Sequence, residues 1–395
     1  MKYSHLIFSL ALLSAVTSTV AKTDACESYL ADMDFMEYVT CYSYPVASHI
    51  VVTDDQHELT LFRLQAKNSI MTSGKPVVLL WHGLLDCGDT WIANEENFAP
   101  AFVLANQGYD VWVGNSRGTK YSLGHRLYDQ RTSEAFWNFS WMEMSELDLP
   151  AAFEFVARST GQKINYIGHS QGTTQMFAAL ANPSGKNEKI TKNLKKFAAL
   201  GPVAYTGHVE SPFFTFLAKS NTMIEIAKYM GKYGLFLPGW TSTSAAKIVC
   251  MRWKWMCSNL VQQIADRNSS VNNMERMKVF GAHFPSPTSV RNLLHWRQGL
   301  LNNGVFRKYD FGEAENLRRY GQKTPPVYDP NLITEDIAMF VGTDDLLAVP
   351  TDATAWFNAL TNSKKSYHQY RIGHLTFLMG QELAYMNDLL EFLKN

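Results

Sequence analysis

The predicted fold depends on nine residues, Ile164-Asn165-Tyr166-Ile167-Gly168-His169-Ser170-Gln171-Gly172. A short apolar run leads into a Gly-x-Ser-x-Gly motif, and the small, apolar segment 173–181 that follows is typical of a helix packed on a sheet. A strand, a sharp turn at serine and a helix form a nucleophile elbow, where flanking glycines avoid side-chain clashes. The stretch therefore makes Ser170 the candidate nucleophile.

A second copy of the motif, Gly114-Asn115-Ser116-Arg117-Gly118, lacks the helix on its carboxyl side. It follows the apolar run Tyr109–Val113, but the next residues, Thr119–His125, have the composition of a loop. The elbow should also come two strands after the loop that completes the oxyanion site, and Ser116 comes one strand too early. We expect Ser116 to be a structural loop serine.

Short apolar runs elsewhere in the chain predict the rest of the sheet. They alternate with helical stretches, at Val77–Trp81, Asp110–Val113, Ile164–Ile167, Phe197–Leu200 and Ile337–Val341. Runs of this length, bounded by Gly, Pro or Asp, are typical of parallel strands buried on both faces. Two earlier runs, His49–Thr53 and Glu58–Leu64, flank a polar turn and predict a β-hairpin. The expected fold class is α/β, with a mostly parallel central sheet flanked by helices.

The strand pattern weakens between residues 203 and 327, which are aromatic and helical in tendency. Because strands resume at Ile337, we interpret 203–327 as a helical insertion between two strands and not as a separate tandem domain. The sheet domain then comprises 22–202 and 328–395. Residues 1–21 are predicted to be a secretory signal peptide, with a positive start, a short apolar run and small residues at the cleavage site.

Composition and charge exclude several classes of protein. The chain has 395 residues, of which 36 are Lys or Arg and 36 are Asp or Glu, so its formal net charge is +0. A balanced chain carries no argument for binding nucleic acid. No apolar run after the leader reaches the ~18 residues that a transmembrane helix needs. We expect a soluble mature protein of the secretory pathway, secreted into a lumen or lysosomal.

The cysteines follow no metal-binding pattern, since neither Cys-x-x-Cys nor His-x-x-x-His occurs. We therefore expect no metal and no cofactor. In an oxidising pathway the nearest pair, Cys250 and Cys257, could close a short loop. Cys26 with Cys41 is a weaker second pair, which leaves Cys87 free.

Two Asn-x-Ser sequons survive as candidate glycosylation sites, at Asn138 and Asn268. Asn138 lies between Trp137 and Phe139, so we expect burial to disfavour its modification.

An oxyanion hole needs two backbone N–H donors aimed at the developing negative charge. The residue after the nucleophile, Gln171, supplies one of them. The other should come from the loop after an earlier strand, where Val77–Trp81 runs into His82-Gly83-Leu84-Leu85. Gly83 lets the backbone turn, so that the Leu84 amide can point into the site.

The candidate base and acid follow Ser170 in the chain, as the order Ser, Asp or Glu, His requires. His374 follows Gly373 in a loop at the end of a predicted strand, whereas His368 lies within that strand. We predict His374 as the base. The acid should follow the run Ile337–Val341, where Asp344 and Asp345 are adjacent; spacing alone leaves both open.

The chain resembles the acid lipase family at Ser170, Asp345 and His374 and at the segment 82–85. This family of the α/β-hydrolase superfamily includes gastric lipases, lysosomal acid lipase and insect relatives, and the resemblance covers nearly the whole mature chain. Its most specific stretches are 110–118, 161–163, 168–174, 288–292 and 345–348. The family's catalytic Asp leads an Asp-Leu-Leu-Ala segment, which selects Asp345 over Asp344.

The resemblance carries further expectations. It supports Leu84 and Gln171 as oxyanion donors, and it identifies 203–327 as a cap with a mobile lid. Relatives carry a cap disulfide near Cys250 and Cys257.

Large apolar residues are concentrated in the insertion. Many such residues, in a segment that covers a serine hydrolase site, favour a lipid substrate. Trp253 and Trp255, beside Arg252 and Lys254, suit a lipid–water interface, where one end of the ring is wet. We predict a lipase that hydrolyses triacylglycerols or steryl esters through an acyl-Ser170 intermediate, without a cofactor. The alternatives are a soluble carboxylesterase acting on small esters and a catalytically silent lipid-binding protein. Oligomeric state stays open.

Overall fold

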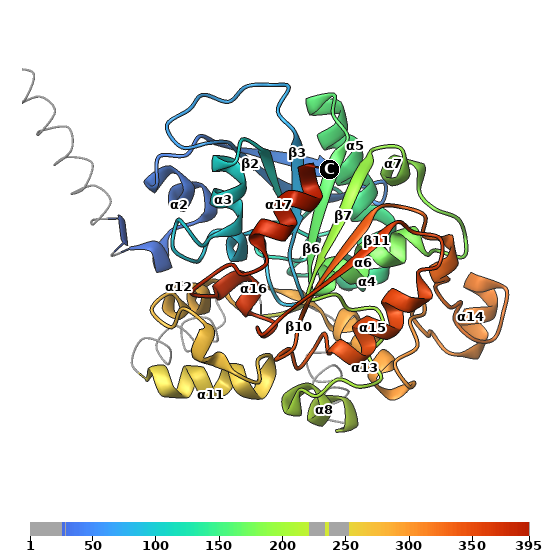
Figure 1. Cartoon of the computed structure of the whole chain (residues 1–395). Helices are drawn as coiled ribbons and strands as arrows, with labels where there is room; N and C mark the ends of the chain where they lie inside the picture. The colour runs from blue at the N-terminus through green and yellow to red at the C-terminus, as the bar shows by residue number, and fades with distance from the viewer. Residues whose placement is uncertain (1–25, 28, 221–233, 237–252, 395) are drawn as a thin grey trace, which may run out of the picture.

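The computed structural model describes residues 26–27, 29–220, 234–236 and 253–394. The predicted signal peptide and Cys250, with its expected bond to Cys257, lie outside these residues. The described part contains a nine-stranded sheet in the order β1-β2-β4-β3-β6-β7-β10-β11, with β5 paired to β2. Helices flank the sheet on both faces (Figure 1), which confirms the predicted α/β class.

The strands are β1 (Val46–Val52), β2 (His57–Leu64), β3 (Val77–Trp81), β4 (Asp110–Gly114), β5 (Gly124–His125), β6 (Ile164–His169), β7 (Leu194–Leu200), β8 (Gly234–Leu235), β9 (Thr288–Ser289), β10 (Ile337–Gly342) and β11 (Lys365–Tyr370). The helices are α2 (Phe35–Cys41), α3 (Pro100–Asn106), α4 (Trp141–Glu143), α5 (Leu149–Thr160), α6 (Gln171–Leu180), α7 (Glu188–Thr191), α8 (Pro212–Lys219), α11 (Lys254–Ile264), α12 (Met277–His283), α13 (Val290–Leu301), α14 (Glu313–Tyr320), α15 (Pro350–Ala359), α16 (Thr376–Met379) and α17 (Met386–Lys394).

The pairing directions agree with the expected sheet. β1 and β2 form the predicted antiparallel hairpin, and β2 also pairs antiparallel with β4. From β4 onward the neighbouring strands β4, β3, β6, β7, β10 and β11 are parallel. β7 begins at Leu194, three residues before the predicted start. The prediction started late because Lys195 and Lys196 interrupt the apolar run. The Lys196 amine crosses the Phe392 ring and donates to the Phe392 carbonyl.

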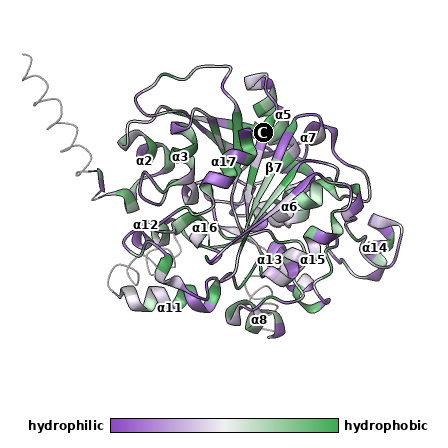
Figure 2. Ribbon diagram, viewed as in Figure 1, coloured by the Kyte–Doolittle hydropathy of each residue, from purple (hydrophilic) through white to green (hydrophobic). Residues whose placement is uncertain are grey.

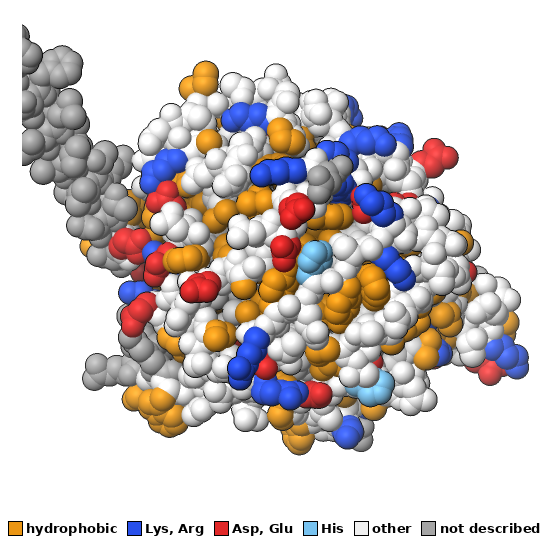
Figure 3. Space-filling model, in the orientation of Figure 1, with side chains coloured by type: hydrophobic (Ala, Val, Ile, Leu, Met, Phe, Trp, Pro, Cys, Tyr) orange, Lys and Arg blue, Asp and Glu red, His pale blue; other side chains and the backbone are white. Residues whose placement is uncertain are grey.

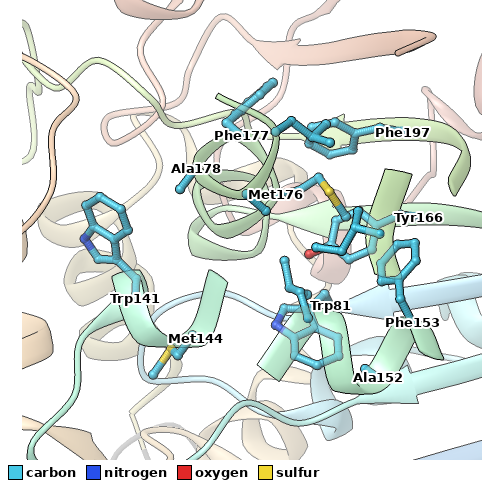
Figure 4. Close-up of a cluster of buried hydrophobic side chains, with 14 of the residues drawn as sticks. Trp81, Trp141, Met144, Ala152, Phe153, Tyr166, Met176, Phe177, Ala178 and Phe197 are labelled. Atoms are coloured by element: carbon cyan, nitrogen blue, oxygen red, sulfur yellow. The ribbon is translucent and has the colours of Figure 1, made fainter. Parts of the chain in front are cut away.

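The central strands β3, β4, β6 and β10 are buried on both faces, as their continuous apolar runs predict. Successive side chains of a strand point to opposite faces, so Val78 and Leu80 of β3 pack into one core layer and Val77, Leu79 and Trp81 into the other. The first layer includes residues of α2, α3 and α17, and the second includes residues of α5 and α6. Figure 4 shows part of the second layer, and in Figure 2 several of the central strands are coloured hydrophobic green along part of their length.

The chain between β7 and β10 supplies α8, α11, α12, α13 and α14, together with the two-stranded sheet β8–β9. In Figure 1, α8, α11, α12 and α13 lie along the lower side of the molecule, below the sheet. The loops after β3, β6, β10 and β11 line one cavity together with residues of these helices. Among the described residues, no helix is both long and apolar enough to span a membrane.

A disulfide joins Cys26 to Cys41 at the end of α2, so the weaker of the two expected pairs is formed. The thiol of Cys87 is free and buried.

The expectation that Asn138 is buried is wrong. Trp137 and Phe139 are buried, but Asn138 between them is exposed, and its amide oxygen accepts a hydrogen bond from Arg291 at 2.6 Å. The chain leaves a short 3₁₀ turn at this point, and its aromatic neighbours pack inward while Asn138 faces outward. Burial therefore does not prevent modification at this sequon.

Candidate active site

The turn that carries Ser170 joins β6 to α6 and has a strained backbone. Ser170 has φ 52° and ψ −121° at the N-terminus of α6, a conformation that costs energy for a residue with a side chain. The flanking glycines permit it by close packing: a Cβ on Gly168 would lie 2.8 Å from the backbone of Gly172, and one on Gly172 would lie 2.4 Å from the Trp81 carbonyl oxygen. β3, β6 and α6 thus hold the serine in place.

His374 and Asp345 come together from two neighbouring loops. His374 lies four residues beyond the end of β11 and Asp345 three beyond β10, and these strands pair in parallel. His374 Nδ1 lies 2.8 Å from Asp345 Oδ2, and both side chains are buried. Asp345 Oδ1 accepts hydrogen bonds from the backbone N–H groups of Leu347 at 2.8 Å and Ala348 at 2.7 Å. The backbone of its own loop therefore fixes the Asp345 carboxylate independently of its contact with the imidazole.

The alternative candidates lie elsewhere. Asp344 is half-buried, and the adjacent Asp345 is the carboxylate that faces His374. His368 stacks on Phe340 within the sheet. Ser116 is fully buried, and its hydroxyl accepts hydrogen bonds from Trp81 Nε1 at 3.0 Å and from Gln175 at 3.4 Å. The Ser116 hydroxyl is thus bonded to side chains of β3 and α6.

The loop after β3 approaches the serine closely. A Cβ on Gly83 would lie 3.1 Å from Ser170 Cβ and 3.5 Å from Ser170 Oγ, so a larger residue here would crowd the nucleophile. Leu84 follows in the same loop and lines the cavity beside Ser170. Gln171 is the first residue of α6, and the N-terminus of a helix presents free N–H groups that favour negative charge.

The Gln171 side chain is held by α13, a contact that no sequence pattern revealed. Its Oε1 accepts hydrogen bonds from Asn292 Nδ2 at 2.9 Å and from Trp296 Nε1 at 2.7 Å. Asn292 is fully buried and also accepts from the Trp141 backbone N–H. The matched stretch 288–292 contained Asn292 without indicating its partner, because 121 positions separate it from Gln171.

A cavity of about 160 Å³ opens beside Ser170 and His374. Its wall is mostly aliphatic and aromatic, with contributions from Phe214, Leu260, Ile264, Met277, Phe280 and Trp296 of the helices between β7 and β10. Asp86 and His169 add polar groups near the two candidate catalytic residues. Such a cavity suits an acyl chain with a few convergent polar groups at one end.

Burial and charge set the titration of the site. Burial by itself lowers the pKa of His374, but the adjacent Asp345 carboxylate, together with Asp266 and Asp86, outweighs burial, so the pKa of His374 is raised. Burial lowers the pKa of His169 well below its ordinary value, which keeps that imidazole neutral. Burial raises the pKa of Asp86 to about 7.

Chemically, this arrangement offers a serine hydroxyl, an imidazole oriented by a carboxylate and backbone N–H donors beside an apolar cavity. Such a set is suited to acyl transfer. Among the described residues, no group of three or more His, Cys, Asp and Glu side chains is placed to hold a metal ion.

Residues 76–381 match a family described as alpha/beta hydrolase fold, and residues 35–95 match one described as a partial alpha/beta-hydrolase lipase region. Gastric triacylglycerol lipase of Rattus norvegicus is 36% identical over 361 residues, which cover 89% of each chain. That of Homo sapiens is 37% identical over 89% of this chain and 87% of its own. Lipase member K of Mus musculus is 33% identical over 89% of this chain and 88% of its own. The chain therefore belongs to the lipase family of the α/β-hydrolase fold and is a carboxylic ester hydrolase.

Proposed function

We propose that this enzyme hydrolyses neutral lipid esters, triacylglycerols or steryl esters, through an acyl-Ser170 intermediate. One observation carries the proposal. The strained turn at Ser170 lines an apolar cavity that also contains His374, whose imidazole is paired with Asp345 at 2.8 Å. A nucleophile and its base thus line a space suited to acyl chains, and the acid that orients the base is buried beside the imidazole.

In the first half-reaction, Ser170 Oγ attacks the ester carbonyl carbon while His374 Nε2 takes the hydroxyl proton. Asp345 holds Nδ1–H of the imidazole and stabilises the imidazolium that forms. The N–H groups of Leu84 and Gln171 stabilise the negative oxygen of the tetrahedral intermediate. His374 then gives its proton to the leaving alkoxide, and the acyl group stays on Ser170. Water repeats the same steps on the acyl-enzyme, which releases the fatty acid and restores the serine.

Two surfaces support a lipid substrate. The cavity wall is mostly apolar, and a neutral ester needs no charged residues for steering. Outside the cavity, α8 and the start of α11 expose Phe213, Phe216, Trp253, Trp255 and Met256. Figure 3 shows hydrophobic side chains at its lower edge, over α11 and α8. The relatives named gastric triacylglycerol lipase favour the same substrate class.

The proposal includes the organisation of the chain. Residues 203–327 act as the cap over a core made of 22–202 and 328–395. The leader 1–21 directs the protein into the secretory pathway, where the Cys26–Cys41 disulfide is stable. Asn138 and Asn268 are the candidate glycosylation sites.

Labelling with a serine-directed phosphonate, followed by mass mapping of the adduct, tests the nucleophile. We expect the adduct on Ser170, and we expect Ser170→Ala to lose several orders of magnitude in turnover. Ser116→Ala is the matched control, because it changes the other Gly-x-Ser-x-Gly serine and should affect stability alone. An adduct on Ser116, or near-normal turnover in Ser170→Ala, would refute the assignment.

A chain-length series of p-nitrophenyl esters, with and without an emulsified phase, tests the substrate class. A lipase should prefer long chains and gain rate at the interface. A preference for short soluble esters without interfacial gain would favour the carboxylesterase alternative, and no turnover in any form would favour a silent lipid-binding protein.

A further inference from the structure

A buried carboxylate, Asp266, lies beside the proposed catalytic residues and takes no part in the mechanism above. It follows the last turn of α11, in the segment between β7 and β10, and its exposed fraction is 0%. Arg267, the next residue, is exposed, and its guanidinium pairs with Glu210 and not with Asp266. A buried charge of this kind is costly unless hydrogen bonds compensate it.

Those hydrogen bonds come from the loop that carries His374. Asp266 Oδ1 accepts from the Leu375 backbone N–H at 2.9 Å, directly after the histidine. Before the histidine, a Cβ on Gly373 would lie 2.4 Å from Asp266 Cγ, so the loop backbone packs against the carboxyl group. Asp266 therefore contacts the chain on both sides of His374.

Asn272 and Thr376 complete the same network. Asn272 Nδ2 donates to Asp266 Oδ2 at 2.7 Å, and Thr376 Oγ1 donates to Asn272 Oδ1 at 2.7 Å. Thr376 Oγ1 in turn accepts from the Gly373 N–H at 3.1 Å. The network closes a ring of hydrogen bonds from the α11 side to the residues that flank His374.

The backbone of Asp266 also holds the loop of Asp345. The two residues form an antiparallel bridge, in which the Leu346 N–H donates to the Ala265 carbonyl at 2.9 Å and the Arg267 N–H donates to the Asp344 carbonyl at 2.7 Å. The residue thus connects both loops whose side chains must meet.

Charge is the second consequence of this position. Within the part of the chain that the structure describes, four titratable groups face His374 from the surrounding elements: Asp345, Asp266, Asp86 and His169. Asp345 has the largest influence among them, and both Asp266 and Asp86 also raise the pKa of His374. Burial raises the pKa of Asp266 itself to about 6, so the group carries negative charge near neutral pH.

We propose that Asp266 is a positioning residue of this hydrolase: its carboxylate fixes the His374 loop against the Asp345 loop and places a second negative charge near the imidazole. The inference rests on the proposed roles of Ser170, His374 and Asp345. The insertion would then help to position the catalytic residues in addition to covering the substrate.

The test compares pH profiles of kcat/KM on a soluble p-nitrophenyl ester for wild type, Asp266→Asn and Asp352→Asn. Asp266→Asn keeps the shape and removes the charge, so the acid limb should move to lower pH by roughly half a unit, about a threefold gain in relative rate on that limb. The plateau kcat should fall roughly tenfold through lost positioning, with KM little changed. Asp352 is the matched control, since it is a buried carboxylate that binds His208, and its variant should leave the limb in place.

A second variant, Thr376→Val, keeps the charge but breaks the ring of hydrogen bonds. It should lower kcat without moving the acid limb, and it keeps the proposal testable if Asp266→Asn folds poorly. An unmoved acid limb in folded Asp266→Asn, or a normal kcat in Thr376→Val, would overturn the role of Asp266. If Ser170→Ala kept turnover, the proposed function itself would be wrong; an inactive Ser170→Ala with a normal Asp266→Asn profile would remove only this inference.

Discussion

At the scale of single residues, the Asp345 carboxylate has one oxygen for each of two tasks. Oδ1 accepts hydrogen bonds from the backbone N–H groups of Leu347 and Ala348, which fixes the turn after β10. Oδ2 faces His374 Nδ1. Because Oδ1 is already occupied, Oδ2 is held in a single direction and can select the imidazole tautomer that leaves Nε2 free for the serine proton.

This division of tasks predicts the effect of Asp345→Asn. An amide that presents its N–H₂ to His374 favours the wrong tautomer, so kcat should fall by about 10⁴-fold while the protein stays folded. Asp344→Asn changes the adjacent carboxylate in the same loop and should retain nearly full activity. Steady-state kinetics on a soluble ester, with circular dichroism to verify folding, measures both; a larger loss in Asp344→Asn would exchange the two roles.

The sequence could name Ser170 and His374 because each occupies a local pattern, a motif between strand and helix or a loop after a strand. It could not separate Asp344 from Asp345 by spacing, because the choice depends on which carboxyl group accepts the N–H groups of the next turn. Asp266 and Asn292 were missed for another reason. Each is a polar residue in a helical insertion, and its partners lie 109 and 121 positions away, so no local periodicity marks it.

At the scale of elements, α8 and α11 each have an inner and an outer apolar surface. Phe214 and the buried Val261 line the cavity, whereas Phe216 and Trp255 are each 65% exposed. Large exposed apolar groups that rim a cavity are typical of an interaction surface. Contact with a lipid phase would remove these side chains from water while the inner residues receive the substrate.

We therefore expect Phe216→Ser and Trp255→Ser to weaken adsorption to emulsified lipid. Burial of a large apolar side chain is worth about 1.5–3 kcal/mol, so each variant should bind the interface roughly tenfold or more weakly. Activity on a soluble short ester should change little, because neither side chain lines the cavity. Leu127→Ser, which changes another strongly exposed apolar residue, is the control and should behave as wild type in both assays. Equal losses on soluble and emulsified esters would contradict an interfacial role.

Element prediction succeeded where a pattern is local and apolar. The runs at β3, β4, β6 and β10 gave their strands because both faces of the sheet are buried, so nearly every residue is hydrophobic. β7 was predicted too short because its two lysines interrupt the apolar run: Lys195 is exposed at an irregularity of the ladder, and Lys196 is buried with its amine on the Phe392 carbonyl. The Asn138 side chain was placed inside because its neighbours are aromatic, but composition does not report which way one residue points in an irregular turn.

At the scale of the whole molecule, buried titratable groups act on stability in opposite directions. Burial lowers the pKa of His295 to about 3 and of His82 to about 4, and both stay neutral in the folded protein. Burial raises the pKa of Asp86 to about 7 and of Asp266 to about 6. On acidification from pH 7 to 5, the histidines take up protons only when the chain unfolds, which destabilises the fold. The aspartates take up protons while folded, which stabilises it.

Single variants should separate the two contributions. His295 has an unfolded pKa near 6.5, so between pH 7 and 5 it costs the wild type roughly 2 kcal/mol, whereas Asp86 contributes roughly 2 kcal/mol over the same interval. The stability deficit of His295→Asn should therefore shrink from pH 7 to pH 5, and that of Asp86→Asn should grow. Urea unfolding midpoints at the two pH values measure these differences. Deficits that change in the same direction would contradict the assignment, and so would deficits that do not depend on pH, which is the result expected of a merely structural loss.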